Sequence, residues 1–255
     1  MISTPSAAIL LLEKANYYHY PKCCYPPPRK SELLSFIDAL NAASLRRRLN
    51  RSLVIQEAHH LAQIDGEDLS ITWHYAGYCR VEQEASIDFS IDTDNNIPFD
   101  KLECFAYDLR HDPLRKHKIR PILVGPDGIS KKITVPFLEH LTAQEPFAVV
   151  LVCKLSGCMK GGVEYYTATV SFEQDKIRHY SARLIFVHDR PEWLRVYESS
   201  AARGTRLLKD LRPTHETHET SEYIDSAEDV PAQAARIYVF QCAQSLRKEG
   251  RQLSG

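Results

Sequence analysis

The most constraining feature of this chain is a nearly continuous succession of predicted strands across residues 69–197. In the clearest of them, 69–75, apolar and polar residues alternate with a period of two. A strand with this pattern places Leu69, Ile71 and Trp73 on one face and the polar residues between them on the other. The pattern therefore predicts a strand that buries one side in a core.

More predicted strands follow after short turns. They are 85–91, 102–109, 119–124, 129–135, 147–153, 165–172, 177–187 and 193–197. Pro126, Asp127 and Gly128 fit the second to fourth positions of a type I turn, which predicts a hairpin around them. A second hairpin is expected around 173–176, between the two strands that flank this segment.

The connections between these strands are too short for crossover helices, which parallel sheets require, so the pairing is expected to be antiparallel. We therefore predict a mainly β fold, an antiparallel immunoglobulin-like β-sandwich with an N-terminal helical segment and a C-terminal helix. A barrel is the alternative packing of the strands.

The segments on either side of the strands have other patterns. Leu33, Ile37 and Leu40 recur at helical spacing near the N-terminus. Residues 214–230 carry six acidic residues and no Lys or Arg, which is typical of a solvated linker. The predicted organisation is an N-terminal helical segment with a Tyr/Pro-rich loop (1–66), a β-sandwich domain (67–199), an acidic linker (200–230) and a C-terminal helix (231–250).

The composition limits the possible classes of function. The chain has 255 residues, a formal net charge of -1 and a hydrophobic fraction of 44%, so no overall field attracts nucleic acid or an anionic membrane. No apolar stretch reaches the roughly 18 to 20 residues that span a bilayer. The short apolar run 7–12 favours a helix rather than a signal peptide, because no basic residue precedes it. The seven cysteines are accordingly expected to be reduced thiols in a cytoplasmic protein.

Two sets of residues are candidate metal sites. Residues 92–103 place oxygen ligands at calcium-loop positions, but Ile97 stands where the sharp turn needs glycine, which favours an acidic loop between strands. Cys153 and Cys158 lack the Cys-x2-Cys spacing of zinc sites, and His215 and His218 fall in the predicted linker. We therefore predict no metal and no cofactor.

The sequence contains no recognisable catalytic motif. Nucleophilic catalysis by Cys or Ser needs a base nearby, for which His59, His60, His140 and His179 are candidates. No glycine-bracketed nucleophile elbow and no phosphate-binding glycine loop is present. No catalytic residue is therefore predicted.

Two basic clusters are candidate binding sites. The first, within 46–51, contains Arg46, Arg47, Arg48 and Arg51. The second, within 110–120, offers a possible anion site made of Arg110, Arg115, Lys116, Lys118 and Arg120. The alternatives are that the first cluster complements a helix dipole and that the second is a solvated loop.

The segment 17–28 is the least ordinary stretch, because it combines four tyrosines with four prolines. Such a segment forms a rigid contact surface or a strap across the sandwich. The predicted partner-binding residues are Tyr17, Tyr18, Tyr20, Tyr25, Arg46, Arg47 and Arg48.

The sequence alone thus favours a non-enzymatic cytosolic binding or regulatory module that docks another protein. Nucleic-acid or nucleotide binding through 46–51 and 110–120 is one alternative, and a Cys/His or metal-dependent hydrolase is another. No membrane partner is expected.

Overall fold

The computed structural model describes most of the chain from Asn50 onward. The described residues are 50–92, 97–110, 118–128, 130–159, 163–169, 176–200, 203–231 and 234–242. The helices and the Tyr/Pro-rich loop predicted within 1–49 lie outside this set, as do residues 93–96 of the predicted calcium loop.

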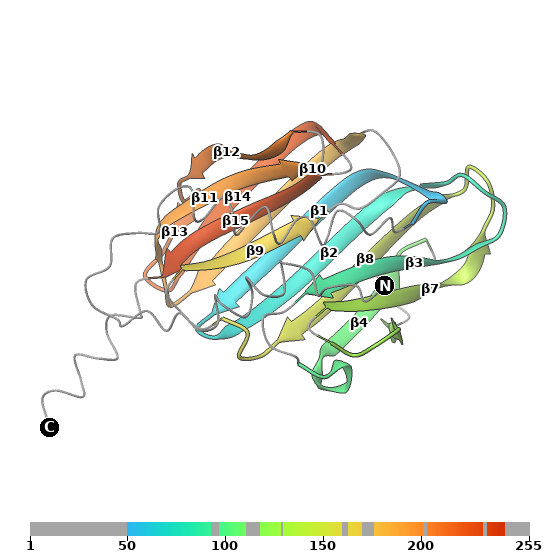
Figure 1. Cartoon of the computed structure of the whole chain (residues 1–255), viewed down its shortest axis with the longest axis horizontal. Helices are drawn as coiled ribbons and strands as arrows, with labels where there is room; N and C mark the ends of the chain where they lie inside the picture. The colour runs from blue at the N-terminus through green and yellow to red at the C-terminus, as the bar shows by residue number, and fades with distance from the viewer. Residues whose placement is uncertain are drawn as a thin grey trace, which may run out of the picture.

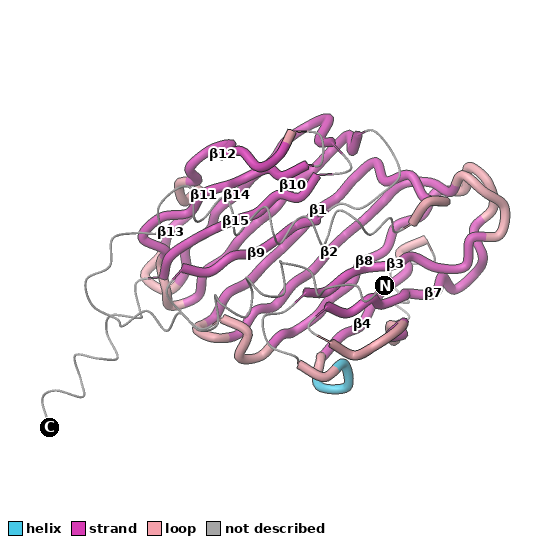
Figure 2. The backbone as a smooth tube through the Cα atoms, in the orientation of Figure 1, coloured by secondary structure: helices cyan, strands magenta, loops and turns pink. Residues whose placement is uncertain are grey.

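Strands make up nearly all of the regular structure (Figure 2). In chain order they are β1 (Leu53–Asp65), β2 (Asp68–Cys79), β3 (Glu84–Asp92), β4 (Glu103–Asp108), β5 (Lys118–Ile119), β6 (Ile122–Val124), β7 (Ser130–Leu141), β8 (Pro146–Leu155), β9 (Val163–Thr169), β10 (Lys176–Val187), β11 (Pro191–Ser200), β12 (Gly204–Leu211), β13 (His215–Glu216), β14 (Thr220–Pro231) and β15 (Ala234–Cys242). The described residues contain one 3-10 helix, η1 (Phe99–Lys101), and no helix long and apolar enough to span a membrane.

The strands form three sheets in two layers. One layer is an eight-stranded sheet in the order β13-β14-β10-β1-β2-β8-β4-β5. The other layer holds a four-stranded sheet, β12-β11-β15-β9, and a three-stranded sheet, β3-β7-β6. Both small sheets lie against the same face of the large sheet, as Figure 1 and the ring contacts Phe186–Phe240 and Phe137–Phe147 indicate. A mainly β, sandwich-like fold is therefore confirmed, and none of the three sheets closes on itself.

The pairing is antiparallel with one exception. Strand β10 runs parallel to β1 in the middle of the large sheet, whereas β2 pairs antiparallel with β1 on its other side. The prediction of a purely antiparallel sandwich is wrong at this pair. The large sheet also has eight strands, more than the sheets of an immunoglobulin domain contain.

The strand predictions inside 67–199 hold for most elements. The hairpin around Pro126 to Gly128 is confirmed, because β6 and β7 pair antiparallel. The second hairpin prediction is wrong: β9 pairs with β15 in the four-stranded sheet, whereas β10 pairs with β1 and β14 in the large sheet. The chain therefore changes layer between β9 and β10, which local turn chemistry does not reveal.

The helices predicted before and after the β-sandwich are wrong wherever the structure describes those residues. Residues 53–65 were expected to continue the N-terminal helical segment, but they form the central strand β1. Residues 234–242 were expected in the C-terminal helix, but they form β15, in which every residue from Ala234 to Phe240 is buried. A strand buried on both faces has no period of two, so its apolar run resembles that of a buried helix. Residues 243–250 of that predicted helix lie outside the described set.

The predicted acidic linker also belongs to the fold. Strand β14 lies between β13 and β10, and β12 pairs with β11. At the start of β14 buried and outward side chains alternate: Ser221, Tyr223 and Asp225 point into the sandwich, and Glu222 forms an ion pair with Arg183 on the other face. The interpretation as a solvated linker is wrong here because these charges are neutralised by neighbouring strands.

A buried polar cluster joins the layers at the centre of the core. The indole Nε1 of Trp73 donates a hydrogen bond to the hydroxyl of Tyr166 on β9 at 2.8 Å. His60 lies between Tyr166 (Nδ1 to Oη, 3.3 Å) and Tyr75 (Nε2 to Oη, 3.4 Å). The Trp73 ring also stacks on Phe89 of β3. These contacts connect both small sheets to the large one.

A second buried group holds β14 and β15 together. The carboxylate of Asp225 accepts hydrogen bonds from the Tyr238 hydroxyl and from Arg236, each at 2.8 Å, and Lys209 forms an ion pair with it at 2.8 Å. Burial on its own would raise the pKa of Asp225, but these three groups outweigh it and hold that pKa below its ordinary value. The hydroxyls of Tyr238 and Tyr180 are 2.8 Å apart, which extends the network to β10.

Two cysteines on neighbouring strands form a disulfide. Cys104 on β4 lies directly opposite Cys153 on β8, with their Cα atoms 4.3 Å apart. The expectation of reduced thiols therefore does not hold for this pair. Among the described cysteines, Cys79 and Cys158 take no part in a disulfide.

Gly77 is expected to be intolerant of any side chain. It faces the register shift of β1 near Ile55, and a Cβ at this position would overlap the carbonyl oxygen of Val54. We expect Gly77→Ala to lower the free energy of unfolding by about 3 kcal/mol, since the backbone must move. Gly128→Ala is the control, because nothing lies within 4 Å of its Cβ position. Chemical denaturation measures both, and equal stabilities of the two variants would contradict the argument.

The buried imidazole of His60 should make the fold sensitive to acid. Burial, and secondarily the charge of His59, lower the pKa of His60 from 6.5 to about 3. Between these values the unfolded chain binds one more proton than the folded chain. Stability therefore falls as the pH falls through this window, by up to about 1.4 kcal/mol per pH unit.

In His60→Gln this part of the pH dependence should disappear, because glutamine binds no proton and still forms hydrogen bonds. His218→Gln is the matched control, since the His218 side chain is 89% exposed and should leave the slope unchanged. Urea unfolding between pH 7 and pH 4 gives the slopes. A wild-type slope in His60→Gln would show that another group causes the acid sensitivity.

Candidate functional site

The candidate site lies on the outer face of the large sheet, opposite the two small sheets. Side chains alternate along β1, so His60 points into the core while His59 points outward with its side chain 40% exposed. In the strand register His59 is opposite His74 on β2 and Ser181 on β10. Three polar side chains therefore form a row across three adjacent strands.

His59 in this row contacts the hydroxyl of Ser181 and lies near a carboxylate outside the row. The Nδ1 atom of His59 is 2.7 Å from the Oγ atom of Ser181. Its Nε2 atom is 3.6 Å from Oε2 of Glu57, which lies two residues earlier on the same strand and is 46% exposed. One imidazole thus bridges a serine hydroxyl and a carboxylate on a face that solvent reaches.

A second imidazole stacks against the first. The ring centroids of His59 and His74 are 5.5 Å apart, with the planes inclined by 22°. Burial and then the charge of protonated His59 lower the pKa of His74, whereas Glu57 acts in the opposite direction. Protonation of His74 is therefore disfavoured relative to that of an exposed imidazole.

This arrangement matches the requirements of nucleophilic catalysis. A serine attacks an acyl carbon when a base within hydrogen-bond distance accepts its proton, and a carboxylate on the other ring nitrogen stabilises the imidazolium. Ser181 and His59 have the first of these positions, and Glu57, 3.6 Å from the other ring nitrogen, can act on the imidazole through its charge but not through a hydrogen bond. The sequence analysis named His59 as a candidate base, but it did not single out Ser181 or Glu57.

The contact between Ser181 and His59 is a tertiary one, which sequence patterns do not reveal. Ser181 and His59 are 122 residues apart in the chain and meet only through the parallel pairing of β10 with β1. The alternation of β10 does place Ser181 and Arg183 on one face, which a strand prediction can reveal. The contact between the two strands has no local motif.

The partner-binding residues predicted from sequence are not placed by the structure. Those residues are Tyr17, Tyr18, Tyr20, Tyr25, Arg46, Arg47 and Arg48, and all lie outside the described residues, as do Arg115 and Lys116. Their roles therefore stay predictions. Three members of the anion-site prediction, Arg110, Lys118 and Arg120, are described.

Arg110 is already neutralised inside the protein. Its guanidinium donates hydrogen bonds to the Asp108 carboxylate, at 2.7 Å for the shortest, and to Glu145 at 2.9 Å. It also donates to the carbonyl of Glu139 and lies over the ring of Phe137. Burial tends to raise the pKa of Asp108, but Arg110 outweighs it and lowers this pKa. Arg110 thus connects β4 to β7 and to the start of β8.

The other two cations lie near the edge of the large sheet. Lys118 holds its Nζ atom 4.3 Å from the ring centroid of Phe105. Arg120 follows β5 and is exposed. Anion binding by Lys118 and Arg120 stays a prediction.

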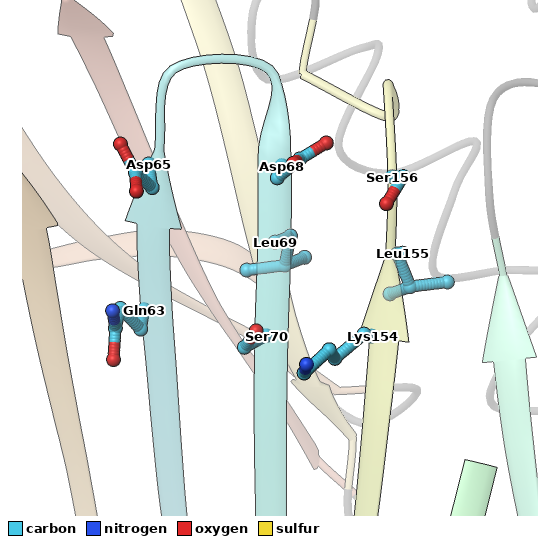
Figure 3. Close-up of a pocket in the computed structure, with 8 residues that line it drawn as sticks. All are labelled: Gln63, Asp65, Asp68, Leu69, Ser70, Lys154, Leu155 and Ser156. Carbon is cyan, nitrogen blue, oxygen red and sulfur yellow. The ribbon is translucent and has the colours of Figure 1, made fainter. Parts of the chain in front are cut away.

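A shallow hollow opens at the end of the β1–β2 hairpin. It measures about 180 Å³ and is lined by residues of β1, β2 and the end of β8, with Lys154 leaning toward Ser70 and Asp68 toward Ser156 (Figure 3). Asp68 accepts a hydrogen bond from the Gly157 amide, and Lys154 forms an ion pair with Glu103. The volume is below the roughly 300–1,000 Å³ of small-molecule pockets, so the hollow suits water or a small ion.

No protein-family model and no curated protein matches the chain. Solved structures with a similar fold include an M1 zinc metallopeptidase from Deinococcus radiodurans, with a TM-score of 0.47 and 12% identity over 74% of this chain and 43% of that one. A mutant of that enzyme with a Tyr-Ser-Ala substrate has a TM-score of 0.45 at 12% identity, over 74% of this chain and 42% of that one. A candidate protease from Parabacteroides distasonis has a TM-score of 0.47 at 7% identity, over 74% and 40% respectively. The chain spans less than half the length of these proteins, and the likeness concerns the fold alone.

This likeness corrects the hypothesis of a non-enzymatic module that docks another protein. That hypothesis rested on the absence of a convergent catalytic set and on the Tyr/Pro and acidic segments. The acidic segment instead forms part of the large sheet, and we do not retain the hypothesis.

The described residues do not fit a zinc ion. Among them, no group of three or more His, Cys, Asp or Glu side chains is placed to hold a metal. The sequence also contains no H-E-x-x-H motif, the pattern by which many zinc peptidases bind their metal. We therefore derive no step through a metal.

Replacing Arg110 should destabilise the fold rather than weaken a surface site. In Arg110→Met the buried Asp108 carboxylate loses its counter-charge, which should lower the free energy of unfolding by about 3 kcal/mol. Arg120→Met, at an exposed position, should change it by less than about 0.5 kcal/mol. Adding Asp108→Asn to Arg110→Met should recover part of the loss. If Arg110→Met is as stable as Arg120→Met, the ion pair does not hold β4 in place.

Proposed function

We propose that this chain hydrolyses esters or amides, with Ser181 as the nucleophile, His59 as the general base and Glu57 as the carboxylate that supports His59. The observation that carries the proposal is the pair of contacts on His59: 2.7 Å from Nδ1 to the Ser181 hydroxyl and 3.6 Å from Nε2 to Glu57. A nucleophile hydrogen-bonded to its base is the first geometric criterion for this chemistry, and a carboxylate beside that base adds to it through its charge.

In the acylation half of the reaction, the Ser181 oxygen attacks the carbonyl carbon of the substrate while its proton moves to Nδ1 of His59. The bond between the carbonyl carbon and the leaving group then breaks, and the leaving group takes the proton from His59. In the second half, water attacks the acyl-serine, His59 accepts a proton from that water, and Ser181 regains it. The products are the acid and the free alcohol or amine.

Two neighbours support these steps. Glu57 stabilises the imidazolium that His59 becomes in each half, and His74, whose own protonation is disfavoured, covers one side of the ring. Arg183 is two residues beyond Ser181 on the same face, where Glu222 holds its guanidinium at 2.7 Å. Since Glu222 neutralises this charge, Arg183 is given no part in stabilising the oxyanion.

The proposal predicts that activity toward p-nitrophenyl acetate depends on Ser181 and His59. We expect Ser181→Ala and His59→Gln each to lower kcat/KM by at least about 100-fold, and Glu57→Gln to lower it by about 10-fold. A fluorophosphonate probe should label the wild-type chain at Ser181, as located by peptide mass spectrometry.

Ser226→Ala provides the matched control. Ser226 lies directly opposite Ser181 on β14 and shares the outer face, but it is exposed and on the side of Ser181 away from His59. Full activity in Ser226→Ala together with loss in Ser181→Ala is the expected result. Equal activity of the two variants, or labelling of another serine, would refute the assignment.

A further inference from the structure

Beyond His74 the outer face of the large sheet becomes apolar. In the register across the sheet, His74 is followed by Val150 on β8 and then by Tyr107 on β4. In the neighbouring row, Val152 is followed by Phe105. We call Val150, Val152, Phe105 and Tyr107 the apolar strip. All four are half-buried on a face where their neighbours toward the hairpin end are polar.

The strip has an ordered aromatic end. The rings of Phe105 and Tyr107 pack edge to face with centroids 5.6 Å apart, and Lys118 covers Phe105. The next row, toward the hairpin end, contains the ion pair of Lys154 with Glu103. The strip is therefore an apolar track with charges along one side, and it starts beside the histidine pair.

The distance between the apolar strip and Ser181 limits which substrates can contact both. Val150 lies three strands from Ser181, which is about 14 Å at the usual spacing of about 4.8 Å between strands. A short acyl group bound at Ser181 cannot reach that far, whereas a long alkyl chain extended across β1 and β2 can. Each methylene that leaves water on apolar side chains adds to the binding energy.

We propose that the apolar strip binds the alkyl chain of a long-chain acyl ester whose carbonyl lies at Ser181. This substrate class rests on the proposed hydrolase function and goes further, because it assigns a binding site and a chain-length preference. The alkyl chain lies across the strands, from the His59–His74 pair to Val150, and chains longer than that of dodecanoate extend from there toward the ring of Phe105.

Binding can be tested separately from hydrolysis with dodecanoate as the probe. Calorimetric titration into Ser181→Ala, which cannot form an acyl-serine at this position, should show binding. Adding Val150→Thr and Val152→Thr should raise the dissociation constant by about 10-fold, because the substitutions keep the β-branched shape and remove apolar surface. Adding Ile185→Thr to Ser181→Ala instead should leave the dissociation constant unchanged, since Ile185 is half-buried on the same face but outside the apolar strip. Absence of binding, or an equal loss in both variants, overturns the proposal.

Hydrolysis gives the second measurement. For the wild-type chain we expect kcat/KM for p-nitrophenyl dodecanoate, kept below its micelle concentration, to exceed that for the acetate by at least about 10-fold. The double variant Val150→Thr/Val152→Thr should lose this preference and keep its activity on acetate. Ser181-dependent hydrolysis with no preference for chain length would overturn the strip and leave the hydrolase intact. Dodecanoate binding that depends on the strip, without Ser181-dependent hydrolysis, would refute the proposed function alone.

Discussion

The arrangement of the whole molecule depends on Trp73 at the junction of its three sheets. The indole projects from the large sheet, donates to Tyr166 of the four-stranded sheet and stacks on Phe89 of the three-stranded sheet. A buried N–H that lacks an acceptor costs on the order of 1–3 kcal/mol, so the hydroxyl of Tyr166 fixes how β9 lies over β2. One side chain thereby couples the positions of the two small sheets, which do not pair with each other.

The two faces of strand β1 place two consecutive histidines in different surroundings. His60 is buried and kept neutral between Tyr75 and Tyr166, whose own pKa values are raised by burial, so no group in that cluster gains charge near neutral pH. The adjacent residue, His59, points the other way and contacts an exposed carboxylate. Two consecutive histidines thus differ in function because the strand alternation gives them opposite surroundings.

Strand existence was predictable from sequence where one face is buried and the other is not. Strands β2 and β3 show this alternation; the prediction 85–91 nearly matches β3, whereas the prediction 69–75 ends four residues before β2 does. Strand β15 was missed because it is buried on both faces, and β14 because its acids are neutralised by residues distant in the chain, such as Arg183 and Lys209. The candidate site was only partly predictable. His59 is recognisable as a possible base, but its contact with Ser181 arises from pairing between strands that no local pattern connects.

That pairing is also what ties the candidate site to the core. β1 has an antiparallel neighbour on one side and a parallel neighbour on the other, and the row from Ser181 through His59 to His74 crosses both. A slip of β10 by one residue would turn its buried side chains outward. A slip by two would keep them buried but would place His179 or Arg183, rather than Ser181, opposite His59. The alternation of apolar residues alone cannot exclude the slip by two residues. The hydrogen bond between Tyr180 and Tyr238 excludes it, because this bond fixes the position of β10 relative to β15. The buried hydroxyls of the inner face thus determine which residue meets His59 on the outer face.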